Sequence, residues 1–380
     1  MRYVFAAFAA FAFLVSVVAQ PRPRARDLGI VVGIYPSGAR NAITDVDGVR
    51  VGHTTIIEAD RVRTGVTAIV PHGGNVFQDK VAGAVFVGNA FGKLAGSTQV
   101  NELGTIETPI VLTNTLSVGT AMDAVVRYTI AQPGNERVRS VNALVGETND
   151  GGLNDIRGLH VTREHVIAAI TSAAGGPVAE GTVGAGTGTM NYGWKGGIGT
   201  SSRKLPADRG GYVVGVLAQT NFGGNLTIAG VPIFRTLQPP NARIGRADGS
   251  SSDELRMSEG DGSCMLVAAT DAPLDARDLR RLAARAIFGL ARTGSSYSHG
   301  SGDFAIAFST SPEVRSRFNE TAARAHTLLP AEATSPLFEA ALEATEEAVY
   351  NALFQATTVR SAFGTAEAIP IDRVKELLKR

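Results

Sequence analysis

Short apolar runs separated by glycine-rich turns are the feature that most limits how this chain can fold. The 380-residue sequence contains 44 glycines, and many of them stand between apolar runs in residues 29–240. Apolar runs of this length, bounded by turn residues, predict buried strands. We expect strands over residues 66–71, 84–88, 109–113, 141–145 and 212–217, and helices over residues 117–131 and 162–174. Such a mixture predicts a layered α/β or α+β domain.

The second half of the chain begins after a long turn-forming stretch at residues 238–262, which is rich in proline, glycine and serine. The apolar run over residues 263–270 then predicts another buried strand. Asp275 is expected to cap a helix, with Asp278 as its capping-box partner. A strand is expected over residues 304–308, and a last long helix is expected to begin at Ser335-Pro336.

The first 19 residues differ from the rest of the chain. Arg2 is followed by an almost wholly apolar segment, and small residues occupy the −3 and −1 positions before Gln20. This pattern is typical of a secretory signal peptide, although a membrane anchor is an alternative that the length barely permits. Residues 20–28 are expected to form a flexible basic leader. We therefore expect a periplasmic or secreted protein that leaves the membrane after signal removal.

Charge and motif spacing argue against several classes of ligand. The formal net charge is +1, and no basic-aromatic pattern indicates nucleic acid. The glycines of residues 184–189 do not have the spacing of a dinucleotide fingerprint, and no P-loop lysine follows them. The six histidines lack metal-ligand spacing, so we expect neither a metal nor a cofactor. Cys264 is the only cysteine, which excludes an internal disulfide.

The bond between Gly262 and Ser263 is a candidate site of self-cleavage. Glycine gives the backbone freedom to bring the serine hydroxyl toward the preceding carbonyl. Cleavage of the bond would leave Ser263 as a new N-terminus that carries both a hydroxyl nucleophile and an α-amine base, as in N-terminal-nucleophile hydrolases. The plainer interpretation is a loop that enters a strand, and this stretch alone does not decide between the two.

Several longer stretches together resemble the L-aminopeptidase/D-Ala-esterase/amidase family, which includes the β-peptidyl aminopeptidases. The resemblance extends from about Leu28 to the end of the last long helix, which makes it far more specific than any single short motif. The stretches that carry it are NAITDVDGVRVGH at 41–53, VGNAFGKLAG at 87–96, ELGTIETPIVLTNTLS at 102–117, KGGIGTSSR at 195–203, GS at 262–263 and ATDAPLDAR at 269–277.

The resemblance implies an α+β fold, a four-layer αββα sandwich like that of N-terminal-nucleophile hydrolases but with different strand connectivity. It also implies a single domain over residues 29–380 that cuts itself into chains 29–262 and 263–380. Family members release N-terminal residues from small peptides, β-peptides, amides or esters that have a free amine. The resemblance further implies a homo-oligomer, specifically a tetramer.

Individual residues match the functional positions of the family. Ser263 matches the nucleophile and Asn221 the oxyanion donor, while Ser301 and Asp303 match a serine and an acid that orient the nucleophile. Members that act on β-peptides have glutamate at the position of Asp303. Aspartate is one methylene shorter than glutamate.

Two further positions concern the substrate. Glu147 matches the acid that binds the substrate's ammonium group. Asn149 stands where the family has a tyrosine, so a phenol is missing at a position associated with substrate choice.

Two alternatives remain at this point. One is an acyltransferase similar to the ornithine acetyltransferases, which also cleave themselves but at a threonine. The other is an exported binding protein that is not processed and has lost activity. The observation behind this alternative is that Asn149 replaces the tyrosine of the family. Glu147 and Asp303 could also each be ordinary hydrogen-bonded structural residues.

Overall fold

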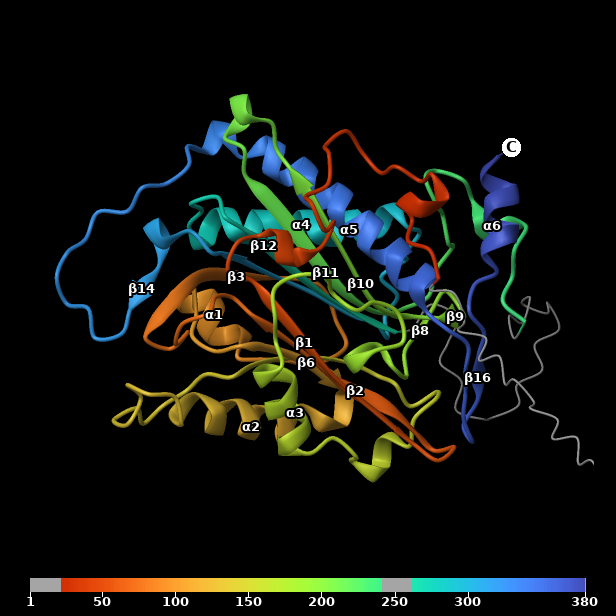
Figure 1. The fold of residues 1–380 in the computed structure, drawn as a ribbon, viewed down its shortest axis with the longest axis horizontal. Helices are drawn as coiled ribbons and strands as arrows, with labels where there is room; N and C mark the ends of the chain where they lie inside the picture. The colour runs from red at the N-terminus through yellow and green to blue at the C-terminus, as the bar shows by residue number, and fades with distance from the viewer. Residues whose placement is uncertain (1–21, 241–261, 380) are drawn as a thin grey trace, which may run out of the picture.

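The fold is a stack of two β-sheets between two layers of helices, as Figure 1 shows for a computed structural model that describes residues 22–240 and 262–379. This is the four-layer αββα arrangement that the family resemblance implied. The expected signal peptide and most of the loop after residue 238 lie outside the described residues.

One sheet has five strands in the order β1-β2-β6-β7-β4. Helices α2 and α3 cover its outer face (Figure 1), and apolar residues of both helices pack with those of β2 and β6. The elements of this half are β1 (Arg50–Glu58), β2 (Val62–Val70), β6 (Ile110–Asn114), β7 (Leu144–Thr148), β4 (Leu94–Ala95), α2 (Val118–Ile130) and α3 (Arg163–Thr171).

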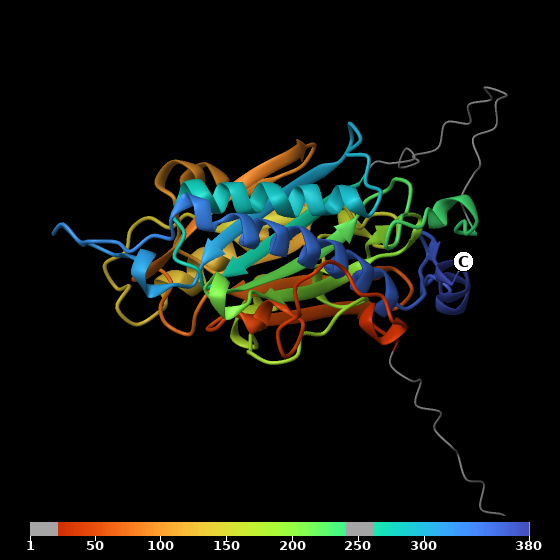
Figure 2. The ribbon, with the colours of Figure 1, turned by 90° about the horizontal axis from the view of Figure 1, so that it is seen from above.

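The other sheet has seven strands, six of them in the order β10-β11-β12-β13-β3-β14, with β5 paired to β3. Helices α4 and α5 lie side by side over its outer face (Figure 2). The elements of this half are β10 (Gly197–Lys204), β11 (Val213–Asn221), β12 (Ser263–Thr270), β13 (Gly302–Ser309), β3 (Asp79–Ala90), β14 (Ser316–Arg317), β5 (Thr105–Ile106), α4 (Ala276–Arg292) and α5 (Ser335–Gln355).

Two hairpins and two short helices are further elements: β8 (Met190–Asn191) with β9 (Trp194–Lys195), β15 (Val359–Arg360) with β16 (Thr365–Ala366), α1 (Ser97–Leu103) and α6 (Ile371–Leu378). No helix within residues 22–240 and 262–379 is long and apolar enough to cross a membrane.

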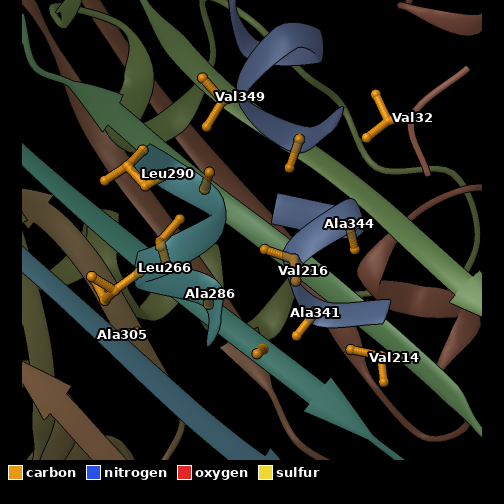
Figure 3. Packing of buried hydrophobic residues seen from close by; sticks show 14 of the residues in the cluster. Val32, Val214, Val216, Leu266, Ala286, Leu290, Ala305, Ala341, Ala344 and Val349 are labelled. Atoms are coloured by element: carbon orange, nitrogen blue, oxygen red, sulfur yellow. The ribbon is translucent and has the colours of Figure 1, made fainter. Parts of the chain in front are cut away.

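The alternation of side chains along β12 explains how the layers are held together. Cys264 and Leu266 face α4 and α5, whereas Met265 and Val267 face the other sheet. Both faces of the strand are therefore buried, which accounts for its continuous apolar sequence. Figure 3 shows the helix-side packing, in which Leu266 lies among residues of β11, β13 and the two helices.

Close contact between α5 and β10 depends on a glycine in the strand. A Cβ on Gly199 would lie 1.9 Å from the carbonyl oxygen of Ala348 in α5, so no other residue fits there without moving the helix. This glycine lies in the stretch KGGIGTSSR, and its packing role explains part of that motif.

Two local predictions need correction. The strand expected over residues 141–145 begins instead at Leu144, because its parallel pairing with β6 begins opposite Ile110. Asp275 does cap α4 by accepting a hydrogen bond from the Asp278 backbone N–H. The Asp278 carboxylate, however, pairs with Arg281 at 2.9 Å, so the cap is not the reciprocal capping box that was expected.

The described part of the basic leader is bound to the body of the protein, which differs from the predicted flexible segment. The Arg22 side chain donates to the carbonyl oxygens of Phe354 (2.6 Å) and Ile369 (2.7 Å). Arg24 forms an ion pair with Glu180 at 2.7 Å. Charged side chains that satisfy buried carbonyls explain why a segment with almost no apolar residues is nevertheless ordered.

A buried ion cluster links the start of the chain, β10 and α5. Arg203 is fully buried and pairs with Glu343 at 3.0 Å and with Glu347 at 2.8 Å, and both glutamates are also buried. Arg26 adds a second cation on Glu347 at 2.9 Å. Removal of one member of a buried pair leaves an uncompensated charge, so this cluster is sensitive to substitution.

We predict that Arg203→Met lowers the free energy of unfolding by about 3–5 kcal/mol, because it leaves buried carboxylates without their main partner. The measurement is urea unfolding in a Ser263→Ala background, so that the result does not depend on whether the chain cleaves itself. Arg292→Met is the control, since Arg292 is partly exposed and its pairs with Glu339 and Glu346 are both 3.6 Å long. The control should cost under about 1 kcal/mol, and equal losses in the two variants would contradict the prediction.

Candidate active site

The start of β12 lies between two other strands, and this position brings together the residues of the candidate site. Ser263 is the first residue of β12, opposite Asn221 on antiparallel β11 and Gly302 on parallel β13. Since side chains alternate along strands, Ser263 and Asn221 lie on the same face, toward the five-stranded sheet. The predicted nucleophile and the predicted oxyanion donor are therefore neighbours.

The Gly262 carbonyl group receives two hydrogen bonds. The Ser263 hydroxyl donates to its oxygen at 2.6 Å, and the Gly302 backbone N–H donates to the same oxygen at 3.0 Å. The carbonyl is thus polarised by a backbone donor while the serine oxygen lies beside it. Electrostatic stabilisation of a developing oxyanion needs donors in this kind of position.

Only glycine fits at position 262. A Cβ there would lie 2.2 Å from the Asn221 carbonyl oxygen and 2.6 Å from the Phe222 Cα, which are both backbone atoms. A side chain would therefore displace the Gly262 carbonyl from the serine. The glycine that the sequence analysis singled out for its freedom is required for close approach to β11.

The Asn221 amide is held in one orientation. Its Oδ1 accepts a hydrogen bond from the Met190 backbone N–H at 2.9 Å. The Nδ2 group is buried and has no hydrogen-bond partner among the described residues. A buried donor without a partner is costly, and such groups are often reserved for function. The amide is thus arranged to donate to a reacting oxygen.

Lys195 supports the turn that holds Asn221. Its ammonium group is fully buried and donates to the carbonyl oxygens of Gly186 (2.8 Å) and Gly196 (2.6 Å). Burial lowers the pKa of Lys195 to about 7, and the charge of Asp150 acts in the opposite direction. By joining the two sides of this turn, Lys195 fixes the segment that carries Met190.

Ser301 and Asp303 lie at the same end of the sheet but not on the same face as the Ser263 hydroxyl. Asp303 is opposite Cys264 in register, and Cys264 belongs to the helix-side core. Burial raises the pKa of Asp303 to about 6, and the adjacent Ser301 hydroxyl lowers it. Burial also raises the pKa of Tyr297, and the Asp303 charge adds to that effect.

The loop that carries Ser301 is held by Asn89 at the end of β3. The Asn89 side-chain amide donates to the carbonyl oxygens of Ser298 (2.8 Å) and Ser301. The Phe91 N–H donates to the Ser301 carbonyl oxygen at 3.1 Å. The end of β3 therefore fixes the backbone before Gly302, whose N–H polarises the Gly262 carbonyl.

Glu147 enters the site from the opposite sheet, at the end of β7. Its side chain is 2% exposed, and the Lys93 backbone N–H donates to its Oε1 at 3.0 Å. Its Oε2 accepts a hydrogen bond from the Thr115 hydroxyl. A Cβ on Gly92 would lie 3.2 Å from Glu147 Oε1 and 3.5 Å from Gly302 Cα. Gly92 therefore lies close to both the Glu147 carboxylate and the start of β13, the strand beside Ser263.

Asn149 has a local role in the structure. It is exposed, and its Oδ1 accepts a hydrogen bond from the Gly151 backbone N–H at 2.9 Å, which closes a turn after β7. Five contributors were not identified from sequence, namely Asn89, Lys93, Thr115, Met190 and Lys195. All except Met190 lie inside stretches that carried the family resemblance, which was the available signal.

The described residues contain no group of three or more His, Cys, Asp or Glu side chains placed to hold a metal ion. The described residues bring together a serine oxygen, a backbone donor on the neighbouring carbonyl and a side-chain amide without a partner, which are groups that acyl transfer uses. The buried acid at the end of β7 can bind a cationic group.

Comparison with known proteins supports this description. A model of peptidase family S58 matches residues 41–366. The chain is 40% identical over 397 residues to the beta-peptidyl aminopeptidase BapA of Sphingosinicella microcystinivorans, with 100% of this chain and 98% of the relative covered.

Solved structures agree in fold. The β-aminopeptidase of a Burkholderia species matches with a TM-score of 0.84 and 39% identity, covering 94% of this chain and 98% of that chain. The L-aminopeptidase D-Ala-esterase/amidase of Ochrobactrum anthropi, described as a prototype of the serine aminopeptidases and a variant of the Ntn hydrolase fold, has a TM-score of 0.83 and 36% identity, covering 94% and 98%. These similarities confirm the expected fold class.

We predict that Asp303→Asn stabilises the folded chain at neutral pH. The folded-state pKa is raised from 3.8 to about 6, so ionisation lowers the stability of the wild type as pH rises through that window. The gain should approach about 3 kcal/mol above pH 6 and vanish below about pH 4.

The measurement is urea unfolding between pH 3.5 and 7.5 in a Ser263→Ala background, with the exposed Asp372→Asn on α6 as control. If the free energies of unfolding of the two variants have the same pH dependence, the ionised Asp303 carboxylate does not destabilise the folded chain and the prediction is wrong.

Proposed function

This chain belongs to peptidase family S58 and is an aminopeptidase, and we propose that it cuts itself before Ser263 and then uses that residue as its nucleophile. The observation that carries the proposal is the pair of hydrogen bonds on the Gly262 carbonyl, from the Ser263 hydroxyl and the Gly302 N–H. The aminopeptidase relatives favour hydrolysis over the acyltransferase and binding-protein alternatives.

In self-cleavage, the Ser263 oxygen attacks the Gly262 carbonyl carbon while the Gly302 N–H stabilises the negative oxygen. The C–N bond then breaks, and the nitrogen takes the proton that the Ser263 hydroxyl gave up and becomes the α-amine of Ser263. An ester now joins Gly262 to the Ser263 oxygen. Water hydrolyses this ester, which leaves a Gly262 carboxylate and a free Ser263 hydroxyl. The products are chains that end at 262 and begin at 263.

In turnover, the α-amine of Ser263 acts as the base for its own hydroxyl. The hydroxyl oxygen attacks the substrate carbonyl, and Asn221 Nδ2 donates to the oxyanion. The leaving amine takes the proton, and water releases the acyl group from the serine. Asp303 and Ser301, at the start of the neighbouring strand, would stabilise the protonated α-amine between these proton transfers.

Glu147 defines the proposed substrate class. A buried carboxylate at the rim of the site would bind the ammonium group of a substrate by a charge-assisted hydrogen bond. The relatives named as β-peptidyl aminopeptidases support β-aminoacyl substrates, and amides and esters with a free amine fit the same chemistry. Asn149, two residues after Glu147, is less bulky than the tyrosine that the family has at this position.

Export and assembly complete the proposal. The apolar segment at residues 1–19, with small residues before Gln20, supports export to the periplasm or the medium. A homo-oligomer is proposed on the family resemblance alone.

We predict that the purified protein consists of two fragments, with the smaller one beginning at Ser263, and that Ser263→Ala stays whole. Gly262→Ala should slow cleavage strongly, because a methyl group would strike the Asn221 carbonyl and displace the scissile bond. Gly119→Ala in α2 is the control, since nothing lies within 4 Å of the added methyl. Intact mass and N-terminal sequencing give the answer, and cleavage of Ser263→Ala at the same bond would rule out the proposed role.

We predict that acetylation of the substrate's amine abolishes turnover and that Glu147→Gln raises KM for free-amine substrates. Loss of a charge-assisted hydrogen bond of about 1.5–3 kcal/mol corresponds to roughly a 10- to 150-fold rise in KM. Steady-state kinetics with paired p-nitroanilides measures both effects.

Glu107→Gln is the matched control for this experiment. Glu107 is also a buried acid with a lysine partner, Lys80 at 2.8 Å. It precedes the first residue of β6, whereas Glu147 lies opposite the last residues of that strand. Its substitution should leave KM unchanged. Equal turnover of acetylated and free-amine substrates would show that Glu147 does not select the amine.

A further inference from the structure

The segment between β3 and β4 gives Glu147 a cation from within the chain. The Lys93 ammonium lies 3.5 Å from Glu147 Oε1, and the Lys93 side chain is 55% exposed whereas that of Glu147 is 2% exposed. The lysine therefore lies on the solvent side of the acid. It contacts the same oxygen that its own backbone N–H contacts at 3.0 Å.

We propose that Lys93 sets the affinity of the enzyme for substrate amines by competing with the substrate's ammonium group for Glu147. This inference rests on the proposed function, because it takes Glu147 as the group that binds the amine. It goes beyond that function by giving Lys93 a role. The Lys93 ammonium group would have to leave Glu147 before the ammonium group of a substrate could take its place.

The contacts of Glu147 show why Lys93 is the partner that can move. The Thr115 hydroxyl donates to Oε2, and the Lys93 backbone N–H donates to Oε1. Two residues before Lys93, the Phe91 N–H donates to the Ser301 carbonyl oxygen. These groups are fixed by the ends of β3 and β6. The Lys93 ammonium, by contrast, is at the end of a flexible side chain with more than half of its surface in solvent.

The exchange keeps the charge of the site constant. The Glu147 side chain is 2% exposed, and burying a charge is costly unless the charge is paired. Exchange of the Lys93 ammonium for that of the substrate replaces one ion pair by another, whereas a substrate with a blocked amine would displace the lysine without supplying a charge. Lys93 therefore lowers the affinity for every amine, because each must first displace the lysine ammonium from Glu147.

The test compares wild type, Lys93→Met, Lys93→Gln and Lys93→Arg, each first checked by mass for the same chain composition. Lys375→Met, an exposed lysine of α6, controls for the loss of one positive charge. The substrates are an aminoacyl p-nitroanilide and a dipeptide with the same N-terminal residue. The inhibition constant of propylamine, which carries an ammonium and no acyl group, is measured in parallel.

The proposal expects both neutral variants to lower KM for the two substrates, and the inhibition constant of propylamine, by about two- to five-fold, the range of a partly exposed ion pair. Lys93→Arg and Lys375→Met should stay near wild type. A rise in KM for the dipeptide alone would overturn the proposal and show instead that Lys93 binds the substrate's carboxylate. Unchanged constants in both neutral variants would also overturn it.

Failure of the proposed function gives a different result. If wild type hydrolyses the N-acetylated p-nitroanilide as fast as the free amine, Glu147 does not bind the amine and the premise is lost. If wild type requires a free amine but the neutral Lys93 variants are unchanged, only the competition by Lys93 is wrong.

Discussion

The pairing of β12 between β11 and β13 is the constraint on which the site depends. It places Gly262 against the backbone of Asn221 so closely that no side chain fits, and it directs the Gly302 N–H to the Gly262 carbonyl. The same register brings Asn221 beside Ser263. A shift of one residue would turn the Ser263 hydroxyl toward the helices and away from the Asn221 amide.

The sheet also explains how a cut chain would stay together. After cleavage before Ser263, strands β10, β11 and β3 would belong to one chain and β12, β13 and β14 to the other. Their order in the sheet interleaves the two chains, so separation would break several strand pairings at once. The ion cluster of Arg203 with Glu343 and Glu347 crosses between the same two chains. The leader arginines Arg22 and Arg26 do so as well, through Phe354 and Glu347.

Much of this architecture could be predicted from sequence because it depends on local patterns. The continuous apolar run of β12 and the cap at Asp275 are short-range signals, and the family resemblance identified Ser263, Asn221 and Glu147 as candidate site residues. The face on which Asp303 lies depends on register with β12, which sequence does not reveal. The contacts of Lys93 and Lys195 join segments that are distant in sequence, and the leader is held mainly by partners between 156 and 347 residues away.

The central claim is that the Ser263 oxygen is the nucleophile, and covalent labelling tests it most directly. The purified enzyme would be treated with a serine-directed sulfonyl fluoride, and the adduct would be located by peptide mass mapping. The account predicts one adduct per active site, on the N-terminal residue of the chain that begins at Ser263, together with loss of activity in proportion to labelling. An adduct on Ser301, or on any residue of the other chain, with the same loss of activity would contradict it.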